Sequence, residues 1–125
     1  MKKVLVCITI QENSKRLISK GAALAKELEG ELHILHIRKG DTIFDAPNTS
    51  DLFEELFIYG SEMGGEVHFL CSQDIVETIC IFIGNNKIKN IILGGSKPGL
   101  QKFGNIKEIL QANFEDLQII IVERE

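Results

Sequence analysis

A glycine-rich segment, Gly94-Gly95-Ser96, has the residue types and spacing of a ligand-binding loop. Glycines tolerate positive φ angles and let backbone N–H groups come close to a phosphate. A helix that begins near Asn105 would add its N-terminal N–H donors. Lys97 and Lys102 would add positive charge, and Ser96 a hydroxyl. The spacing alone fits an anion-binding loop and a plain strand-to-helix connection equally well.

The histidines and the common catalytic motifs give no comparable signal. The sequence contains no GxxxxGK[ST], no GxGxxG after its first apolar segment, and no GxSxG or HExxH. His33, His36 and His68 fall on two predicted strands. Alternation puts His33 and His36 on opposite faces of a sheet, so these two cannot share a metal ion. We therefore expect structural or surface histidines, no metal site, no catalytic residue and no enzymatic activity.

Length and composition indicate one globular domain over residues 1–125. The chain is 44% hydrophobic and 26% charged, which is ordinary for a folded protein. Cys7, Cys71 and Cys80 are odd in number and lack CxxC spacing, so they are expected to be small buried residues rather than disulfide or zinc ligands. The apolar runs are too short for a membrane span or a signal peptide. We expect a cytoplasmic protein.

The charge is unevenly distributed along the chain. The net charge of −4 argues against nucleic acid as a partner, because nucleic-acid binding needs a basic face. Residues 40–86 include nine acids and no Lys or Arg, whereas residues 87–107 include five lysines and no acid. Solvated faces are the simplest explanation of both stretches. The lysine stretch nevertheless surrounds the Gly94 loop, where it would help to hold an anion.

Hydrophobic patterning predicts strands that alternate with helices. The predicted strands are Lys3–Ile10, Leu32–Ile37, Glu66–Leu70, Ile88–Leu93 and Leu117–Glu123. The first predicted helix begins at an Asn13 or Ser14 cap and ends before a C′ glycine at Gly30, and the second runs from Ser50 to Met63, before Gly64-Gly65. The third begins at a Ser72 or Asp74 cap and ends at about Asn86, and the fourth runs from Ile106 to Asn113. Strands separated by helices pair in parallel through right-handed crossovers, which predicts a doubly wound α/β fold.

In such a sheet the ligand crevice lies beyond the carboxyl ends of the strands, where the winding reverses. A strand order of 3-2-1-4-5 would form the walls of this crevice from Thr9–Asn13 and Gly94–Asn105. A flavodoxin-like order of 2-1-3-4-5 would place Cys71–Gln73 there instead. The patterning alone does not choose between the two orders.

Several segments, taken in order, resemble the universal stress protein family. They are Val4-Leu5-Val6-Cys7-Ile8, Asn13-Ser14-Lys15-Arg16-Leu17-Ile18, Ala22-Ala23-Leu24-Ala25, Glu31-Leu32-His33-Ile34-Leu35-His36-Ile37, Asp74-Ile75-Val76-Glu77-Thr78-Ile79 and Ile88-Lys89-Asn90-Ile91-Ile92-Leu93-Gly94. The resemblance covers nearly the whole chain apart from Arg38–Thr49. The opening with Cys7 looks most like the variant of this domain inside potassium-sensing histidine kinases.

The resemblance implies a Rossmann-like, adenine nucleotide alpha hydrolase-like sheet of order 3-2-1-4-5, frequent homodimers and a role in stress or signalling. Its ATP-binding branch resembles Gly-x2-Gly-x9-Gly-[Ser/Thr] after the fourth strand, with an Asp at the end of the first. Counting from Gly94, the second and third glycine positions are Lys97 and Lys107. Gly104-Asn105 stands in for the closing pair only after a loop three residues shorter, and Thr9 occupies the Asp position. The ATP motif is therefore broken at most of its points.

These observations lead to a hypothesis and an alternative. The leading hypothesis is a non-enzymatic universal-stress-type regulatory module, with no certain cofactor, that holds a nucleotide such as ATP or AMP weakly. The nucleotide would lie between Thr9-Ile10-Gln11 and Gly94–Asn105, with its adenine near Ile37. The alternative is a dimeric interaction module without nucleotide binding, which pairs through the Leu117–Val122 edge strand and acts with a signalling partner such as a sensor kinase or a transporter. Neither involves nucleic acid or a membrane, and a small-molecule enzyme is the least favoured possibility.

Overall fold

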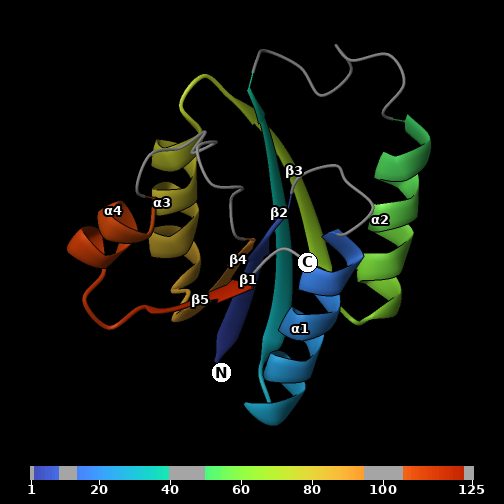
Figure 1. Ribbon diagram of the computed structural model, residues 1–125, viewed down its shortest axis with the longest axis horizontal. Coiled ribbons are helices and arrows are strands. Elements are labelled where there is room, and N and C mark those ends of the chain that lie inside the picture. The colour runs from blue at the N-terminus through green and yellow to red at the C-terminus, as the bar shows by residue number, and fades with distance from the viewer. Residues whose placement is uncertain (1, 9–13, 40–49, 95–105, 123–125) are drawn as a thin grey trace.

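The computed structural model describes residues 2–8, 14–39, 50–94 and 106–122, and within them five strands alternate with four helices (Figure 1). The strands are β1 (Lys3–Cys7), β2 (Glu31–Lys39), β3 (Glu66–Ser72), β4 (Asn90–Gly94) and β5 (Gln118–Val122). The helices are α1 (Ser14–Glu27), α2 (Ser50–Glu62), α3 (Ile75–Asn86) and α4 (Ile106–Asn113). Every predicted element is present, with ends displaced by a few residues.

All five strands are parallel and lie in the order β3-β2-β1-β4-β5. The central strand β1 pairs with β2 on one side and with β4 on the other. This order confirms the doubly wound α/β prediction and excludes the flavodoxin-like alternative. The winding reverses between β1 and β4, so the predicted crevice falls at the carboxyl ends of these two strands.

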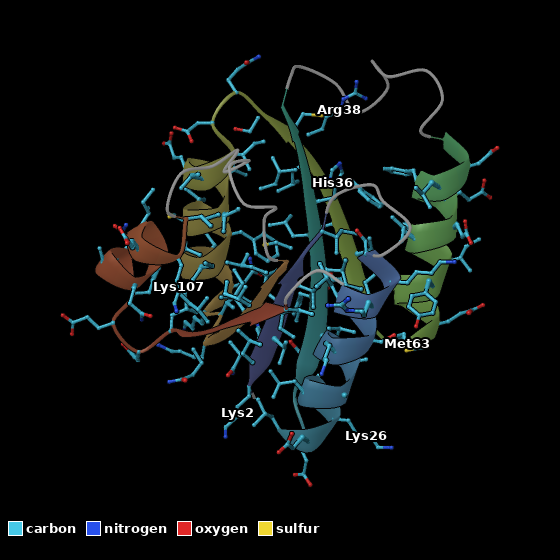
Figure 2. All side chains as sticks on the ribbon, viewed as in Figure 1. Lys2, Lys26, His36, Arg38, Met63 and Lys107 are labelled. Carbon is cyan, nitrogen blue, oxygen red and sulfur yellow. The ribbon has the colours of Figure 1, made fainter. Side chains whose placement is uncertain are left out.

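Helices cover both faces of the sheet, with α1 and α2 on one face and α3 and α4 on the other (Figure 1). Successive residues of a strand point to opposite faces. Leu5 of β1 therefore joins the core cluster under α3 and α4, whereas Val4 and Val6 join the cluster under α1 and α2. All three side chains are fully buried. Side chains fill the space on each side of the sheet (Figure 2), which explains why β1 reads as a continuous apolar run.

Helix α1 lies unusually close to the sheet because Gly21 faces it. A Cβ atom at Gly21 would overlap Cγ2 of Val6, well inside the 3.0 Å that real Cβ contacts respect, and would lie 3.1 Å from Cδ1 of Leu32. The missing side chain thus sets the distance between α1 and β1. Helix α1 begins at Ser14, which is buried.

The end of α1 differs from its prediction by one residue. The left-handed residue is Glu29, with φ of 54°, and not Gly30. Gly30 is required for a different reason, because a Cβ atom there would overlap the carbonyl oxygen of Lys2. Its N–H donates to the carbonyl of Ala25, which closes the last turn. Helix α2 ends at Glu62, one residue before the predicted Met63, and Gly64 follows it with φ of +85°, as a glycine after a helix end should.

Helix α3 begins at the Asp74 cap, one of the two predicted alternatives. The Asp74 side chain accepts a hydrogen bond from the backbone N–H of Glu77 at 3.0 Å. The helix ends at Lys87, which adopts a left-handed conformation with φ of 54°. Among the described residues, no helix has the length and apolar character needed to cross a membrane.

Candidate functional site

The predicted crevice lies where β1 and β4 end side by side, at Cys7 and Gly94. Two of the predicted binding residues, Ile37 and Gly94, fall within the part of the chain that the structure describes. The others lie outside it, namely Thr9, Ile10, Gln11, Gly95, Ser96, Lys97, Gly104 and Asn105. The strand order gives the position at which the winding reverses, and the predicted binding residues themselves remain a prediction.

Ile37 and Gly94 face opposite sides of the sheet. Ile37, near the carboxyl end of β2, is 9% exposed and belongs to the core cluster under α3 and α4. Gly94 ends β4 and faces α1, since a Cβ atom there would lie 3.2 Å from Cδ1 of Leu17. A ligand that contacts both residues must therefore lie across the end of the sheet. Ile37 offers such a ligand little surface.

A hydrogen-bonded histidine holds the chain at the exit of β1. The N–H of Ile8 donates to the carbonyl of Leu35 at 3.0 Å, and Nδ1 of His36 donates to the carbonyl of Ile8 at 2.9 Å. Burial lowers the pKa of His36, partly opposed by the hydrogen bond to Ile8. A neutral His36 therefore acts as a structural clamp on the strand that leads into the crevice.

The cysteines are less buried than predicted, because all three have intermediate exposure. Cys7, Cys71 and Cys80 are all free thiols. Cys7 packs against the core cluster under α3 and α4, and burial raises the pKa of its thiol to about 12. Since the thiolate is the nucleophile and metal ligand, Cys7 is inert at neutral pH although it ends the strand that frames the crevice.

A second group of polar side chains lies at the opposite, amino end of the sheet. His33 of β2 and His68 of β3 point to the same face, and Nδ1 of His33 lies 3.2 Å from Nε2 of His68. Glu66, the first residue of β3, places Oε2 at 3.7 Å from Nδ1 of His33 and Oε1 at 4.0 Å from Nε2 of His68. These three residues offer ligand atoms that all lie within 4.8 Å of one another.

Two further groups complete this cluster. The carboxylate of Glu31 lies 3.3 Å from Nε2 of His33, on the side of the ring that faces away from His68. Nζ of Lys3 lies 4.0 Å from the same carboxylate. Phe82 of α3 packs edge-on against the ring of His68, with ring centroids 4.9 Å apart. His33 is thus held between two carboxylates, and His68 lies between His33 and an apolar ring.

The environment keeps the imidazole of His68 neutral. Its pKa is lowered chiefly by burial, partly restored by the Glu66 carboxylate, and lowered again by His33. The His33 side chain is 7% exposed and that of His68 is 22% exposed, whereas Glu66 is 68% exposed. A buried imidazole and a partly exposed one therefore share a site with one carboxylate that reaches solvent.

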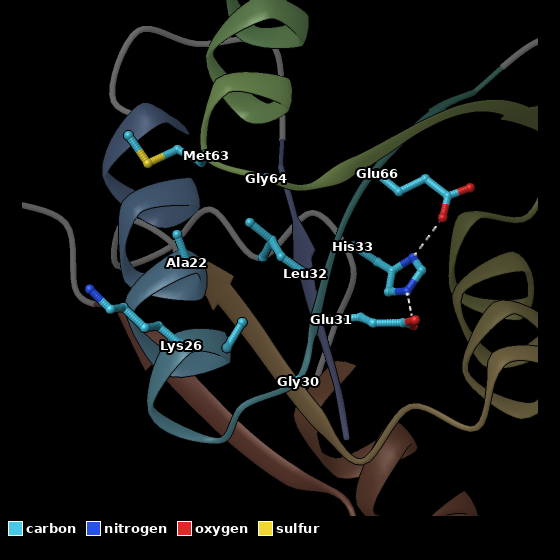
Figure 3. Close-up of a pocket in the computed structure, with 10 residues that line it drawn as sticks. Ala22, Lys26, Gly30, Glu31, Leu32, His33, Met63, Gly64 and Glu66 are labelled. Atoms are coloured by element: carbon cyan, nitrogen blue, oxygen red, sulfur yellow. Dashed lines mark hydrogen bonds and ion pairs between the residues drawn. The ribbon is translucent and has the colours of Figure 1, made fainter. Parts of the chain in front are cut away.

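A pocket of about 450 Å³ opens beside this cluster, and Glu31, His33 and Glu66 belong to its lining. Figure 3 shows Ala22 and Lys26 on one side of β2, while His33 points to the other side, between the carboxylates of Glu31 and Glu66. The pocket lies at the amino ends of the strands. It is therefore distinct from the predicted crevice.

The sequence does not predict that His33 and His68 lie side by side. The opposite placement of His33 and His36 is confirmed, because His33 packs near Phe82 of α3 and His36 near Phe69, which contacts α2. The signal that would have found the pair is the register of β2 and β3. His33 lies opposite Glu66 and Leu35 opposite His68, which puts both histidines on one face two residues apart.

No family model matches the chain, and no curated protein matches it. Solved structures match nearly all of it. A universal stress protein from Archaeoglobus fulgidus superimposes with a TM-score of 0.72 at 16% identity, covering 97% of this chain and 93% of that one. A universal stress protein in complex with cAMP gives 0.68 at 12% identity, covering 97% and 96%. The universal stress protein from Archaeoglobus fulgidus in complex with dAMP gives 0.68 at 18% identity, covering 97% of both chains.

At these identities the likeness concerns the fold. It extends over all five strands and four helices, in agreement with the observed strand order. The chain has the fold of the universal stress proteins.

Proposed function

We propose that this chain is a non-enzymatic regulatory module of the universal stress protein family, and that it binds an adenine nucleotide weakly at the carboxyl ends of β1 and β4. The observation that carries the proposal is the switch point between these strands in a fold whose solved examples include complexes with cAMP and dAMP. Ligands of open α/β sheets bind at such a point.

The charge pattern supports an anionic ligand at this end. Residues 87–107 include five lysines and no acid. Lys87 and Lys89 precede β4, whereas Lys97, Lys102 and Lys107 follow it on the side of the crevice. Phosphate groups would meet Lys97 or Lys102 and the backbone N–H groups around Gly94-Gly95-Ser96. Lys97 stands where the ATP-binding pattern has a glycine, so the affinity for ATP is reduced.

Isothermal titration calorimetry with ATP, AMP, cAMP and dAMP tests the proposal. The wild-type chain should bind at least one of them at millimolar ligand. The double variant K97A/K102A should bind at least roughly 10-fold more weakly, because even one charge-assisted hydrogen bond contributes about 1.5–3 kcal/mol and about 1.4 kcal/mol is a factor of ten in affinity.

The matched control for this experiment is K89A. Lys89 is an exposed lysine that precedes β4, at the other end of the strand from the crevice, and it pairs with Asp116 at 3.1 Å. Removing an exposed ion pair of this kind changes stability little. Absence of heat with all four nucleotides, or equal weakening by K89A and K97A/K102A, would contradict nucleotide binding at this crevice.

A second function, as a dimeric interaction module, is favoured by the outer edge of β5. Within the described residues β5 pairs with β4 alone, and Ile120 is 39% exposed. An apolar edge strand is an aggregation hazard unless another chain covers it. We propose that Leu117–Val122 pairs with the same segment of a second copy, and that the dimer acts with a signalling partner such as a sensor kinase or a transporter.

Sedimentation velocity at micromolar concentration tests the dimer. Ile120→Lys should shift the wild-type dimer toward monomer, because it places a charge on the paired edge. Ile58→Lys is the control, since Ile58 is 47% exposed on α2, which covers the far part of the sheet (Figure 1). A monomeric wild-type chain would refute the dimer while leaving nucleotide binding untouched.

A further inference from the structure

We propose that His33, Glu66 and His68 form a binding site for a divalent zinc ion at the amino ends of β2 and β3. The ligand atoms would be Nδ1 of His33, Nε2 of His68 and one carboxylate oxygen of Glu66. The site lies at the opposite end of the sheet from the nucleotide crevice, so zinc binding does not depend on the proposed nucleotide binding.

The spacing of the two imidazole nitrogens is close to that of two ligands of tetrahedral zinc. Zinc binds histidine nitrogen at about 2.0–2.1 Å and carboxylate oxygen at about 2.0–2.2 Å, so two ligand atoms of one tetrahedral ion lie about 3.3–3.5 Å apart. The observed distance between the two imidazole nitrogens is 3.2 Å. The Glu66 oxygens lie 3.7 Å and 4.0 Å from these nitrogens. A small movement of the exposed Glu66 side chain closes the remaining gap.

Glu31 supplies the outer partner that metal-binding histidines usually have. A ligating histidine commonly donates its other ring N–H to a carboxylate, which fixes the tautomer and makes the coordinating nitrogen more basic. Nε2 of His33 lies 3.3 Å from the Glu31 carboxylate, and Nδ1 lies 3.2 Å from Nε2 of His68. In the tautomer that donates from Nε2 to Glu31, Nδ1 is the nitrogen available to a metal ion. His68 becomes a ligand when its proton resides on Nδ1, and the ion then replaces the contact between the two rings.

The strands and helix α3 hold the two histidine ligands in place. Both histidines are on paired parallel strands, and Phe82 of α3 packs against the rings. Because three protein ligands leave one tetrahedral position open, water would occupy the fourth, on the exposed Glu66 side. Two imidazoles and a carboxylate suit zinc better than magnesium or calcium, which prefer oxygen ligands.

Titration of the full chain with Zn²⁺ tests the proposal, using protein without a polyhistidine tag, since a tag would supply imidazoles of its own. Calorimetry should give one ion per chain. In NMR spectra the ring signals of His33 and His68 should shift with Zn²⁺, whereas those of His36, on the opposite face, should not. This readout needs no variant, so it stays decisive even if a substitution prevents folding.

Variants then assign the ligands. His68→Gln and Glu66→Gln should each weaken zinc binding more than Glu31→Gln does, and Glu31→Gln itself should weaken it about 10-fold or more, as outer-partner substitutions do. Glu54→Gln, which removes an exposed glutamate on α2, should leave binding unchanged. No heat with Zn²⁺, shifts that include His36, or wild-type affinity in His68→Gln would overturn the proposal. Mg²⁺ at the same concentration should give no heat, and equal binding of both ions would contradict the assigned ligand set.

Discussion

Replacing Gly21 by alanine tests how closely α1 must lie against the sheet. Alanine is the better helix former by about 0.8–1.0 kcal/mol, so propensity alone predicts a more stable protein. The structure predicts the opposite. The new methyl group would overlap Cγ2 of Val6 and lie 3.1 Å from Cδ1 of Leu32. Val6 is fully buried on the central strand, and its β-branched side chain has little rotamer freedom.

The magnitude follows from these two opposing effects. Overpacking a close-packed core costs about 1–3 kcal/mol, and the direct overlap with a stiff neighbour argues for the upper end. Subtracting about 1 kcal/mol of helix propensity leaves a net loss of about 2 kcal/mol. For a domain of this size a loss of that amount lowers Tm by roughly 6–12 °C.

Urea and thermal unfolding followed by circular dichroism measure the effect. Gly84→Ala is the matched control, because Gly84 is also helical, in α3, but no atom lies within 4 Å of the Cβ position there. Gly84→Ala should leave stability unchanged or raise it by up to about 1 kcal/mol. If Gly21→Ala is as stable as the wild type, or if both variants shift Tm in the same direction, then α1 does not pack so closely on β1 that a methyl group at position 21 is excluded.

Three further predictions concern α3, Cys7 and the histidines. Asp74→Ala should lower the free energy of unfolding in urea by about 1 kcal/mol, since it removes the acceptor for the N–H of Glu77; an unchanged midpoint would show that the cap contributes nothing. Iodoacetamide at pH 8 should leave Cys7 unmodified in the native chain and alkylate it in urea, as detected by mass spectrometry, because its native pKa is about 12; rapid native alkylation would refute the burial of this thiol. The pKa values of His36 and His68 are lowered in the native state, so the unfolded chain binds protons first and stability should fall as pH drops through about 6.5. His36→Gln keeps an N–H donor for the carbonyl of Ile8 and should reduce the loss of stability at low pH. If the variant loses as much stability as the wild type, His36 does not contribute to the pH dependence.

The sheet was predictable because its signals are local. Val4, Leu5 and Val6 are buried on both faces and form an uninterrupted apolar run, whereas Gly21 and Ala25 mark the helix face that packs on them. Strand order is not a local property, and patterning left two orders open until the resemblance selected one. The end of α1 was displaced by a residue because a glycine near a helix end suggests a positive φ, whereas Gly30 is selected by its approach to Lys2.

The candidate sites were predictable to different degrees. The crevice location follows from topology, but its lining residues apart from Ile37 and Gly94 lie outside the described part of the chain. The cluster at the amino end could not be read from sequence spacing, because His33 and His68 are 35 residues apart. They meet through the register of β2 on β3, which periodicity does not specify.

Mapping amide shifts by NMR during titration with AMP tests whether an adenine nucleotide binds where β1 and β4 end. Ile8 and Gly94 should shift progressively with millimolar AMP, because they stand at the carboxyl ends of these strands. Glu31 and Glu66, at the amino end, should remain unchanged. Shifts confined to the amino end, or none at the highest AMP concentration, would show that AMP does not bind at this crevice.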